Sequence, residues 1–370
     1  MNPLPDPMAP QAFRDPGVAA ALARRIRRLA ERTGPAALME VCGTHTVALF
    51  RSGVRALLGD CVTLLSGPGC PVCVTPADIV DRAAAYAKTP GVTVATYGDM
   101  MRVPGSRGSL DQARAAGGQV RVVYSPSDAL ALAAKNPDMR VVFLGVGFET
   151  TAPAAAAAVL HARRDGLDNF MVLNAHKLIP PALHALAAMP GLKLDGLICP
   201  GHVSAIIGLG PYREVTGKHN LPCVVTGFEP LDLLQGILML LEQKARGEAA
   251  VENQYARAVR PQGNPRARDI LFQVFEPVDA VWRGLGAVPG GGMAFREEFD
   301  AFDAAARIPL DIGPAPDPPG CRCAAVLVAA VKPPECPLFA NRCAPDHPVG
   351  PCMVSSEGAC AAHYKYGDLS

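Results

Sequence analysis

Six of the twelve cysteines in this chain of 370 residues lie between positions 321 and 360. Prolines interrupt this stretch so often that few side chains remain to build an apolar core. Thiolates that share one metal centre would order such a segment, because metal binding contributes free energy of folding. The paired C-x2-C spacing of zinc sites is absent there, whereas an iron-sulfur cluster accepts irregular spacing. The tail is therefore predicted to hold a cluster, with zinc, or unrelated thiols and disulfides, as alternatives.

Four of the six tail cysteines would suffice for a cluster. Cys323 could take the place of Cys321, and the spacing leaves the role of Cys352 open. The predicted ligands are Cys321, Cys336, Cys343 and Cys360.

Four short motifs rich in glycine and polar residues each follow a predicted strand. Parallel sheets bind ligands at the carboxyl ends of their strands, so these loops are expected to converge on one cleft between two lobes. The motifs are Cys-Gly-Thr-His-Thr at 42–46, Gly-Pro-Gly-Cys-Pro-Val-Cys at 67–73, Gly-Phe-Glu-Thr-Thr at 147–151 and Pro-Gly-His-Val-Ser at 200–204.

Cys70 and Cys73 form a C-x-x-C pair at a predicted strand-to-helix turn. A helix N-terminus favours thiolate, and the short loop permits a reversible disulfide, so we interpret the pair as redox-active. The alternative is one half of a four-cysteine metal site. The nearest candidates for its other half, Cys42 and Cys61, do not form a second pair of that spacing.

Cys42 precedes a glycine and lies three residues before His45. A soft thiolate beside an imidazole suits low-valent iron or a sulfur-bound intermediate, although a buried inert cysteine at a strand end is an equal alternative. Glu149 and His202 could reach the same cleft. The alternatives are a carboxylate that only stabilises a helix N-terminus, and a loop histidine that is only hydrogen-bonded.

Short apolar runs rich in β-branched residues alternate with helical stretches between residues 36 and 246, which is typical of parallel α/β sheets. We expect an N-terminal tail and helix at 1–35, one α/β lobe at 36–140, a second at 141–250, and a helical and cysteine-rich domain at 251–370. Strands are predicted at 37–41, 62–66, 92–96, 120–124, 140–146, 170–174, 196–199 and 223–226.

The charges nearly cancel, with 35 Lys and Arg against 34 Asp and Glu, so no strong field attracts nucleic acid or an anionic membrane. An apolar run of about 18 residues is absent, and the N-terminus is rich in proline and lacks the pattern of a signal peptide. We therefore expect a cytoplasmic protein that binds neither nucleic acid nor membrane. Its thiols would stay reduced, which favours metal or redox chemistry over structural disulfides.

Together with Cys-Met-Val-Ser-Ser-Glu-Gly-Ala-Cys at 352–360, the four strand-end motifs closely resemble the hydrogenase maturation protein family HypD. The resemblance runs in order from about residue 36 to the C-terminus. It implies two Rossmann-like parallel-sheet lobes plus a C-terminal iron-sulfur domain with a 4Fe-4S cluster. It also implies a complex with the small chaperone HypC, on which a transient Fe(CN)2CO moiety is assembled with cyanide from HypE and HypF.

Carried over by position, the resemblance implies that Cys42 holds the iron together with a cysteine of HypC. Cys70 and Cys73 would exchange electrons with the cluster, and the three remaining polar residues would orient ligands or relay protons. The implied role is a maturation scaffold rather than a conventional turnover enzyme. The alternatives are a stand-alone iron-sulfur thiol-disulfide oxidoreductase and a zinc-stabilised binding module. The three remaining polar residues are His45, Glu149 and His202.

Overall fold

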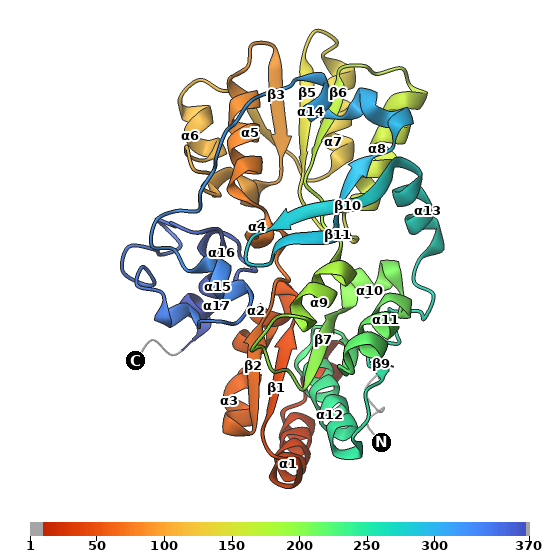
Figure 1. Cartoon of the computed structure of the whole chain (residues 1–370), viewed down its shortest axis with the longest axis vertical. Helices are drawn as coiled ribbons and strands as arrows, with labels where there is room; N and C mark the ends of the chain where they lie inside the picture. Colours follow the sequence, from red (N-terminus) through yellow and green to blue (C-terminus); the bar gives the residue numbers. More distant parts are fainter. Residues whose placement is uncertain (1–9, 368–370) are drawn as a thin grey trace, which may run out of the picture.

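The computed structural model describes residues 10–367 and contains two parallel β-sheets, one above the other in Figure 1. The lower sheet has the order β2-β1-β7-β8-β9 and the upper sheet the order β4-β3-β5-β6. The strands of the lower sheet are β1 (Ala36–Glu40), β2 (Val62–Ser66), β7 (Gly196–Pro200), β8 (Cys223–Thr226) and β9 (Val251–Asn253). Those of the upper sheet are β3 (Val92–Thr96), β4 (Val120–Val122), β5 (Arg140–Gly145) and β6 (Phe170–Asn174).

Strand pairing crosses the boundary expected between residues 140 and 141. β1 pairs with β7 through Leu38 and Gly196, whereas β5 pairs with β6 through Val141 and Phe170. The lower lobe is therefore assembled from the first and last strands of the α/β region, and the upper lobe is inserted between them. The sequence could not show this, because strands buried on both faces look alike and do not encode their neighbours.

Helices cover both faces of each sheet, as expected for parallel strands. The longest two are α1 (Pro16–Thr33) and α12 (Pro230–Arg246), which pack together on the lower sheet and share one apolar core with it. The others up to α13 are α2 (Gly43–Arg51), α3 (Val54–Leu58), α4 (Pro71–Val74), α5 (Ala77–Lys88), α6 (Leu110–Ala115), α7 (Pro126–Lys135), α8 (Ala152–Arg164), α9 (Ile179–Ala187), α10 (Gly201–Ile207), α11 (Gly210–His219) and α13 (Pro265–Val274).

An antiparallel hairpin, β10 (Phe275–Trp282) and β11 (Gly286–Phe295), lies between the lobes (Figure 1). The sequence predicted a helical and cysteine-rich domain at 251–370, and for residues 275–295 the prediction of helices was wrong. Glycine and proline are frequent in β11, and both residues are rare inside strands, so no strand was predicted there. Packing stabilises the hairpin instead: Trp282 stacks on Phe148 with ring centroids 5.7 Å apart and donates a hydrogen bond to the carbonyl of Gly291.

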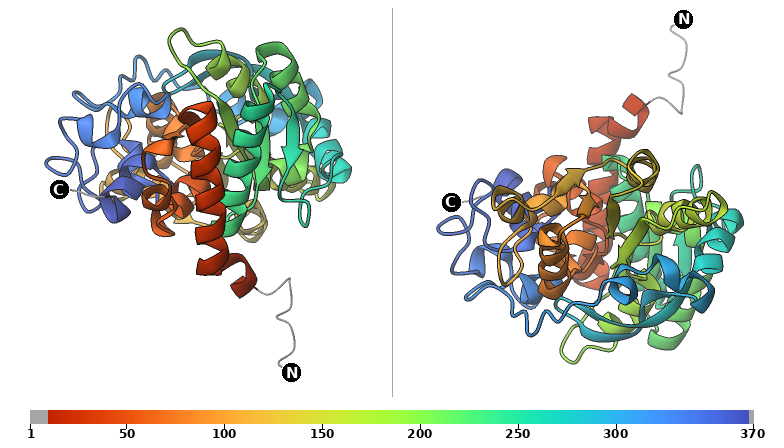
Figure 2. Two further views of the ribbon diagram at one scale, coloured as in Figure 1. Left: turned by 90° about the horizontal axis from the view of Figure 1, so that it is seen from below. Right: turned by 90° about the horizontal axis from the view of Figure 1, so that it is seen from above.

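The cysteine-rich segment packs against the lower lobe. Its helices contact α2 and α4, the two helices that begin within the predicted motifs at 42–46 and 67–73. In both views of Figure 2 the C-terminal segment lies on the side of the molecule away from the green helices α10–α12. No helix within residues 10–367 is long and apolar enough to cross a membrane. The helices after β11 are α14 (Ala304–Arg307), α15 (Cys323–Leu327), α16 (Pro351–Val354) and α17 (Ala359–Tyr366).

Candidate functional site

A cavity of about 390 Å³ lies where the carboxyl ends of strands from both sheets meet. All four predicted motifs contribute to its wall, and so does a loop of the C-terminal segment. The convergence expected from the strand-end positions is therefore present. Most of the lining surface is apolar. Its polar or motif-bearing residues include Cys42, Thr44, Gly69, Asp99, Gly147, Thr150, Thr151, His202, Ser355 and Glu357.

Two of the predicted site residues line this cavity and the other four do not. Cys42 and His202 line it directly. Cys70 lies just behind the wall, with its Sγ 3.4 Å from the Oγ of the lining residue Ser355. The other three predicted residues, Cys73, His45 and Glu149, are buried and do not line it.

Cys42 sits at the N-terminus of α2, pressed against the loop that carries the C-x-x-C pair. The Gly43 amide donates a hydrogen bond of 3.0 Å to the Gly69 carbonyl. A Cβ on Gly69 would lie 2.1 Å from the Cys42 nitrogen, so only glycine allows this approach. On the other side, a Cβ on Gly43 would lie 2.5 Å from the carbonyl oxygen of Glu357. The backbone of Cys42 and Gly43 is therefore enclosed by two segments that are distant in sequence, one at Gly69 and one at Glu357.

Burial raises the pKa of the Cys42 thiol to about 11, and the nearby Glu357 carboxylate acts in the same direction. The backbone amides of Thr44 and His45 oppose this effect by hydrogen bonding to the sulfur. At neutral pH the group is thus a thiol, not a thiolate. A cation that binds to it must displace the proton, as metal binding to cysteine generally does.

Glu357 is a site residue that the sequence analysis did not single out. It lines the cavity, and its Oε1 accepts a hydrogen bond of 2.6 Å from the Thr44 hydroxyl. The two residues are 313 positions apart, so local spacing could not connect them. The only signal was its position between Cys352 and Cys360 in the tail motif.

Cys70 and Cys73 form a disulfide across the first turn of α4. The bond is buried, since only 4% of Cys70 and none of Cys73 is exposed. Arg283, at the end of the hairpin, holds this turn: its side chain donates to the Cys73 carbonyl at 3.1 Å and its backbone amide to the Val74 carbonyl. A large group from solvent therefore has no open path to these sulfur atoms.

His45 is fully buried, and burial lowers its pKa to about 4, so its ring is neutral at pH 7. Its Nε2 lies 3.1 Å from the Gly227 carbonyl, which can only accept, so Nε2 carries the proton. Nδ1 then has a free lone pair, and it has no hydrogen-bond partner within the described part of the chain. The Phe228 ring faces both His45 and the lining residue His202, at centroid distances of 4.6 and 4.1 Å.

Glu149 turns away from the cavity although its neighbours Phe148 and Thr150 line it. Its Oε1 accepts a hydrogen bond of 3.0 Å from the Ile179 amide at the start of α9. Burial raises its pKa to about 7. His176 and Lys177 are buried beside Gly147 but do not line the cavity; burial lowers their pKa values to about 3 and about 8.

The thermal midpoint of the wild type is expected to fall, relative to Glu149→Gln, as the pH rises from 5 to 8. Between its ordinary pKa of 4.5 and its folded pKa of about 7, the folded state keeps a proton that the unfolded state releases. Wild-type stability is therefore lost across this window, by on the order of 3 kcal/mol in total. In Glu149→Gln this position does not titrate, so the variant does not lose stability through it over the same pH range. A pH-independent difference between the two midpoints would contradict the raised pKa.

The six tail cysteines all line a second, smaller cavity, together with Leu338, Phe339, Gly350 and Met353. Burial opposes ionisation of Cys323, but hydrogen bonds from the thiols of Cys321 and Cys352 lower its pKa. The same bonds raise the pKa values of Cys321 and Cys352. Cys323 thus contacts both Cys321 and Cys352. The structure does not single out which four of the six cysteines would be cluster ligands.

These donors fit an iron-sulfur cluster in chemical type, because the lining holds thiols and apolar groups and neither carboxylate nor imidazole. Gly350 is required beside them, since its Cβ would lie 2.5 Å from the Cys321 sulfur. Among residues 10–367, no three His, Cys, Asp or Glu side chains are arranged to hold a single metal ion.

Fold and cavity define a two-lobed α/β protein with a cysteine-bearing site between its sheets. A family model described as HypD, hydrogenase formation hypA family, matches residues 17–367. The chain belongs to the HypD family, which confirms the resemblance found in the motifs.

Curated relatives match the chain along nearly all of its length. The hydrogenase maturation factor HypD of Azotobacter vinelandii is 49% identical over 362 residues, covering 96% of both chains. Those of Rhodobacter capsulatus and Cupriavidus necator are each 45% identical over 365 residues, covering 96% of this chain and 97% and 96% of theirs.

Proposed function

We propose that this chain is a hydrogenase maturation factor that serves as scaffold and redox protein for assembling the Fe(CN)2CO moiety of nickel-iron hydrogenases. The observation that carries the proposal is the position of Cys42. Among the described residues it is the single cysteine that lines the cavity between the lobes, and a disulfide pair stands directly behind the wall.

The cavity suits an iron atom with small diatomic ligands as cargo. Cys42 would bind the iron through sulfur, with a cysteine of the chaperone HypC as the second thiolate. Cyanide and carbon monoxide would then lie against apolar groups such as Val41, Val72 and Phe148, which line the same cavity. His202 and Glu357 supply the few polar groups that a largely apolar binding site needs to orient its ligand.

The tail cysteines would hold a 4Fe-4S cluster, with Cys321, Cys336, Cys343 and Cys360 as ligands. When bound, the cluster supplies single electrons. Residues 352–355 join the two cysteine groups: Cys352 lines the thiol cavity, and the hydroxyl of Ser355 contacts Cys70. Two electrons and two protons would convert the disulfide of Cys70 and Cys73 into two thiols next to the iron.

The proposed partners are HypC, which would cover the cavity, and HypE with HypF as cyanide donor. The rival function, a stand-alone thiol-disulfide oxidoreductase, requires a substrate sulfur to reach Cys70 or Cys73. Both residues are at most 4% exposed, which favours electron transfer through the protein over attack on an external disulfide. The third candidate function is a binding module in which the tail cysteines hold zinc.

Anaerobic purification of the chain together with HypC is expected to give a brown protein with about four iron and four acid-labile sulfide per chain. Additional iron on the complex should come with infrared bands of bound cyanide and carbon monoxide. The scaffold predicts negligible turnover of small disulfides by the chain alone. Stoichiometric zinc without sulfide would overturn the cluster, and rapid partner-free turnover would favour the oxidoreductase.

A further inference from the structure

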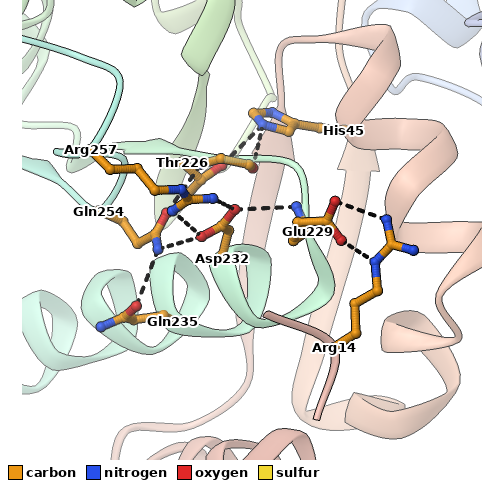
Figure 3. A network of polar contacts seen from close by, with 9 residues as sticks. Arg14, His45, Thr226, Glu229, Asp232, Gln235, Gln254 and Arg257 are labelled. Carbon is orange, nitrogen blue, oxygen red and sulfur yellow. Dashed lines mark hydrogen bonds and ion pairs between the residues drawn. The ribbon is translucent and has the colours of Figure 1, made fainter. Parts of the chain in front are cut away.

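An ion pair between the buried Asp232 and the partly exposed Arg257 lies at the start of α12 (Figure 3). The Asp232 side chain is completely buried, and the Arg257 guanidinium donates to both of its oxygens, at 2.8 and 2.5 Å. Burying a carboxylate is costly unless its oxygens are paired and hydrogen-bonded. Such a pair outside the cavity wall therefore needs a structural reason.

The pair holds the loop 226–229, which joins β8 to α12. Asp232 Oδ2 accepts a hydrogen bond of 3.2 Å from the Glu229 amide, and its Oδ1 accepts one of 2.8 Å from the Gln254 side chain. Gln254 in turn accepts a hydrogen bond of 3.0 Å from the Gly227 amide. A Cβ on Gly227 would lie 2.2 Å from Asp232 Oδ2, so the loop fits closely around the carboxylate.

The same loop holds His45. The Gly227 carbonyl and the Thr226 hydroxyl both lie 3.1 Å from His45 Nε2 (Figure 3). The Phe228 ring contacts the rings of both His45 and His202. A shift of this loop would therefore release the proton-bearing nitrogen of His45 and the stacking surface of His202 together.

The N-terminal residues close the outer side of this assembly. The Arg257 guanidinium lies 4.1 Å above the Phe13 ring and 4.5 Å above the Tyr255 ring. Arg14 forms a bidentate ion pair with Glu229, at the other end of the same loop (Figure 3). Phe13 and Arg14 precede residues 17–367, the range that the family model matches.

We propose that Asp232, Gln254 and Arg257, backed by Phe13 and Arg14, are positioning residues that fix the imidazole of His45 in the Nε2-protonated tautomer. Its Nδ1 lone pair is thereby kept free, in the first turn of the helix that begins after Cys42. The role of this tautomer in iron assembly rests on the proposed function. The contacts that fix the tautomer are a property of the metal-free chain. It extends the candidate site to an N-terminal segment more than 200 positions away in sequence from its partner Glu229.

Nitrogen-15 NMR of the histidine rings in the metal-free chain tests the proposal, with the His45 signals assigned from His45→Gln. The wild type is expected to show a protonated Nε2 and a bare Nδ1. In Gln254→Ala, which removes a half-buried side chain that hydrogen-bonds to Gly227, Asp232 and Gln235, the two nitrogen shifts should move toward each other as tautomers exchange. Arg14→Ala should give a smaller movement in the same direction.

Arg25→Ala is the matched control, because Arg25 also ties the N-terminal helix to α12, through Glu242, without contacting the loop. It should leave the His45 shifts unchanged. A folded Gln254→Ala protein with wild-type His45 shifts would overturn the proposal, as would equal shifts in Arg25→Ala and Arg14→Ala. The measurement uses no iron, chaperone or cyanide. Its outcome can therefore be interpreted even if the proposed function is wrong.

Discussion

Replacing Cys42 with alanine is expected to abolish the cyanide and carbon monoxide infrared bands of the complex with HypC. The substitution removes the single thiol, among the described residues, that lines the cavity, and the neighbouring side chains Thr44 and Glu357 offer only oxygen. Iron that carries cyanide and carbon monoxide prefers soft sulfur ligands to these oxygens. The loss should therefore be complete rather than graded.

The cluster absorbance should survive the same substitution, because Cys42 does not line the cavity of the tail cysteines. Cys61→Ala is the control: this cysteine is half-buried beside α3, lines neither cavity, and should leave bands and absorbance unchanged. Infrared spectra of the two co-purified complexes, recorded at equal chain concentration, give the comparison. Unchanged bands in Cys42→Ala would show that the iron is held elsewhere.

The strands could be predicted from sequence because each is a short apolar run bounded by turn residues. The ranges 62–66, 92–96, 170–174 and 223–226 coincide with β2, β3, β6 and β8. Which strands are neighbours could not be predicted, because the pairing of β1 with β7 depends on contacts far apart in sequence. The hairpin was missed for a different reason: its glycines are tolerated because tertiary packing on Phe148 and Trp282 outweighs their low strand propensity.

The position of the cavity could be predicted from the sequence, because the loops that follow parallel strands lie at one edge of the sheet. Side-chain direction within a loop was not predictable, and Glu149 shows this: Phe148 and Thr150 face the cavity while the carboxylate between them faces α9. His176 and Lys177 could have been found by the same rule, as a polar pair after β6, although neither lines the cavity. Glu357 could not, because the contact with Thr44 that gives it a role is not local.

Cys336→Ala is expected to remove the cluster absorbance and the solubility of the chain together. Around Cys336 the backbone is held by short-range bonds: its amide donates to the Pro333 carbonyl, and its own carbonyl accepts from Phe339. Turns of this kind order a proline-rich segment only when something closes the larger loops, and thiolate ligation would do so. Loss of one ligand should therefore release the segment that covers α2 and α4.

Cys323→Ala provides the contrast within the same cavity. It removes a buried thiol of equal size, but one that the proposed ligand set does not use, so iron and sulfide content should stay near the wild-type value. The measurement is anaerobic iron and sulfide analysis of the soluble fraction, with visible absorbance. A soluble brown Cys336→Ala protein would show that the ligand set is wrong. A colourless Cys323→Ala protein would instead place this cysteine, and not Cys321, among the four ligands.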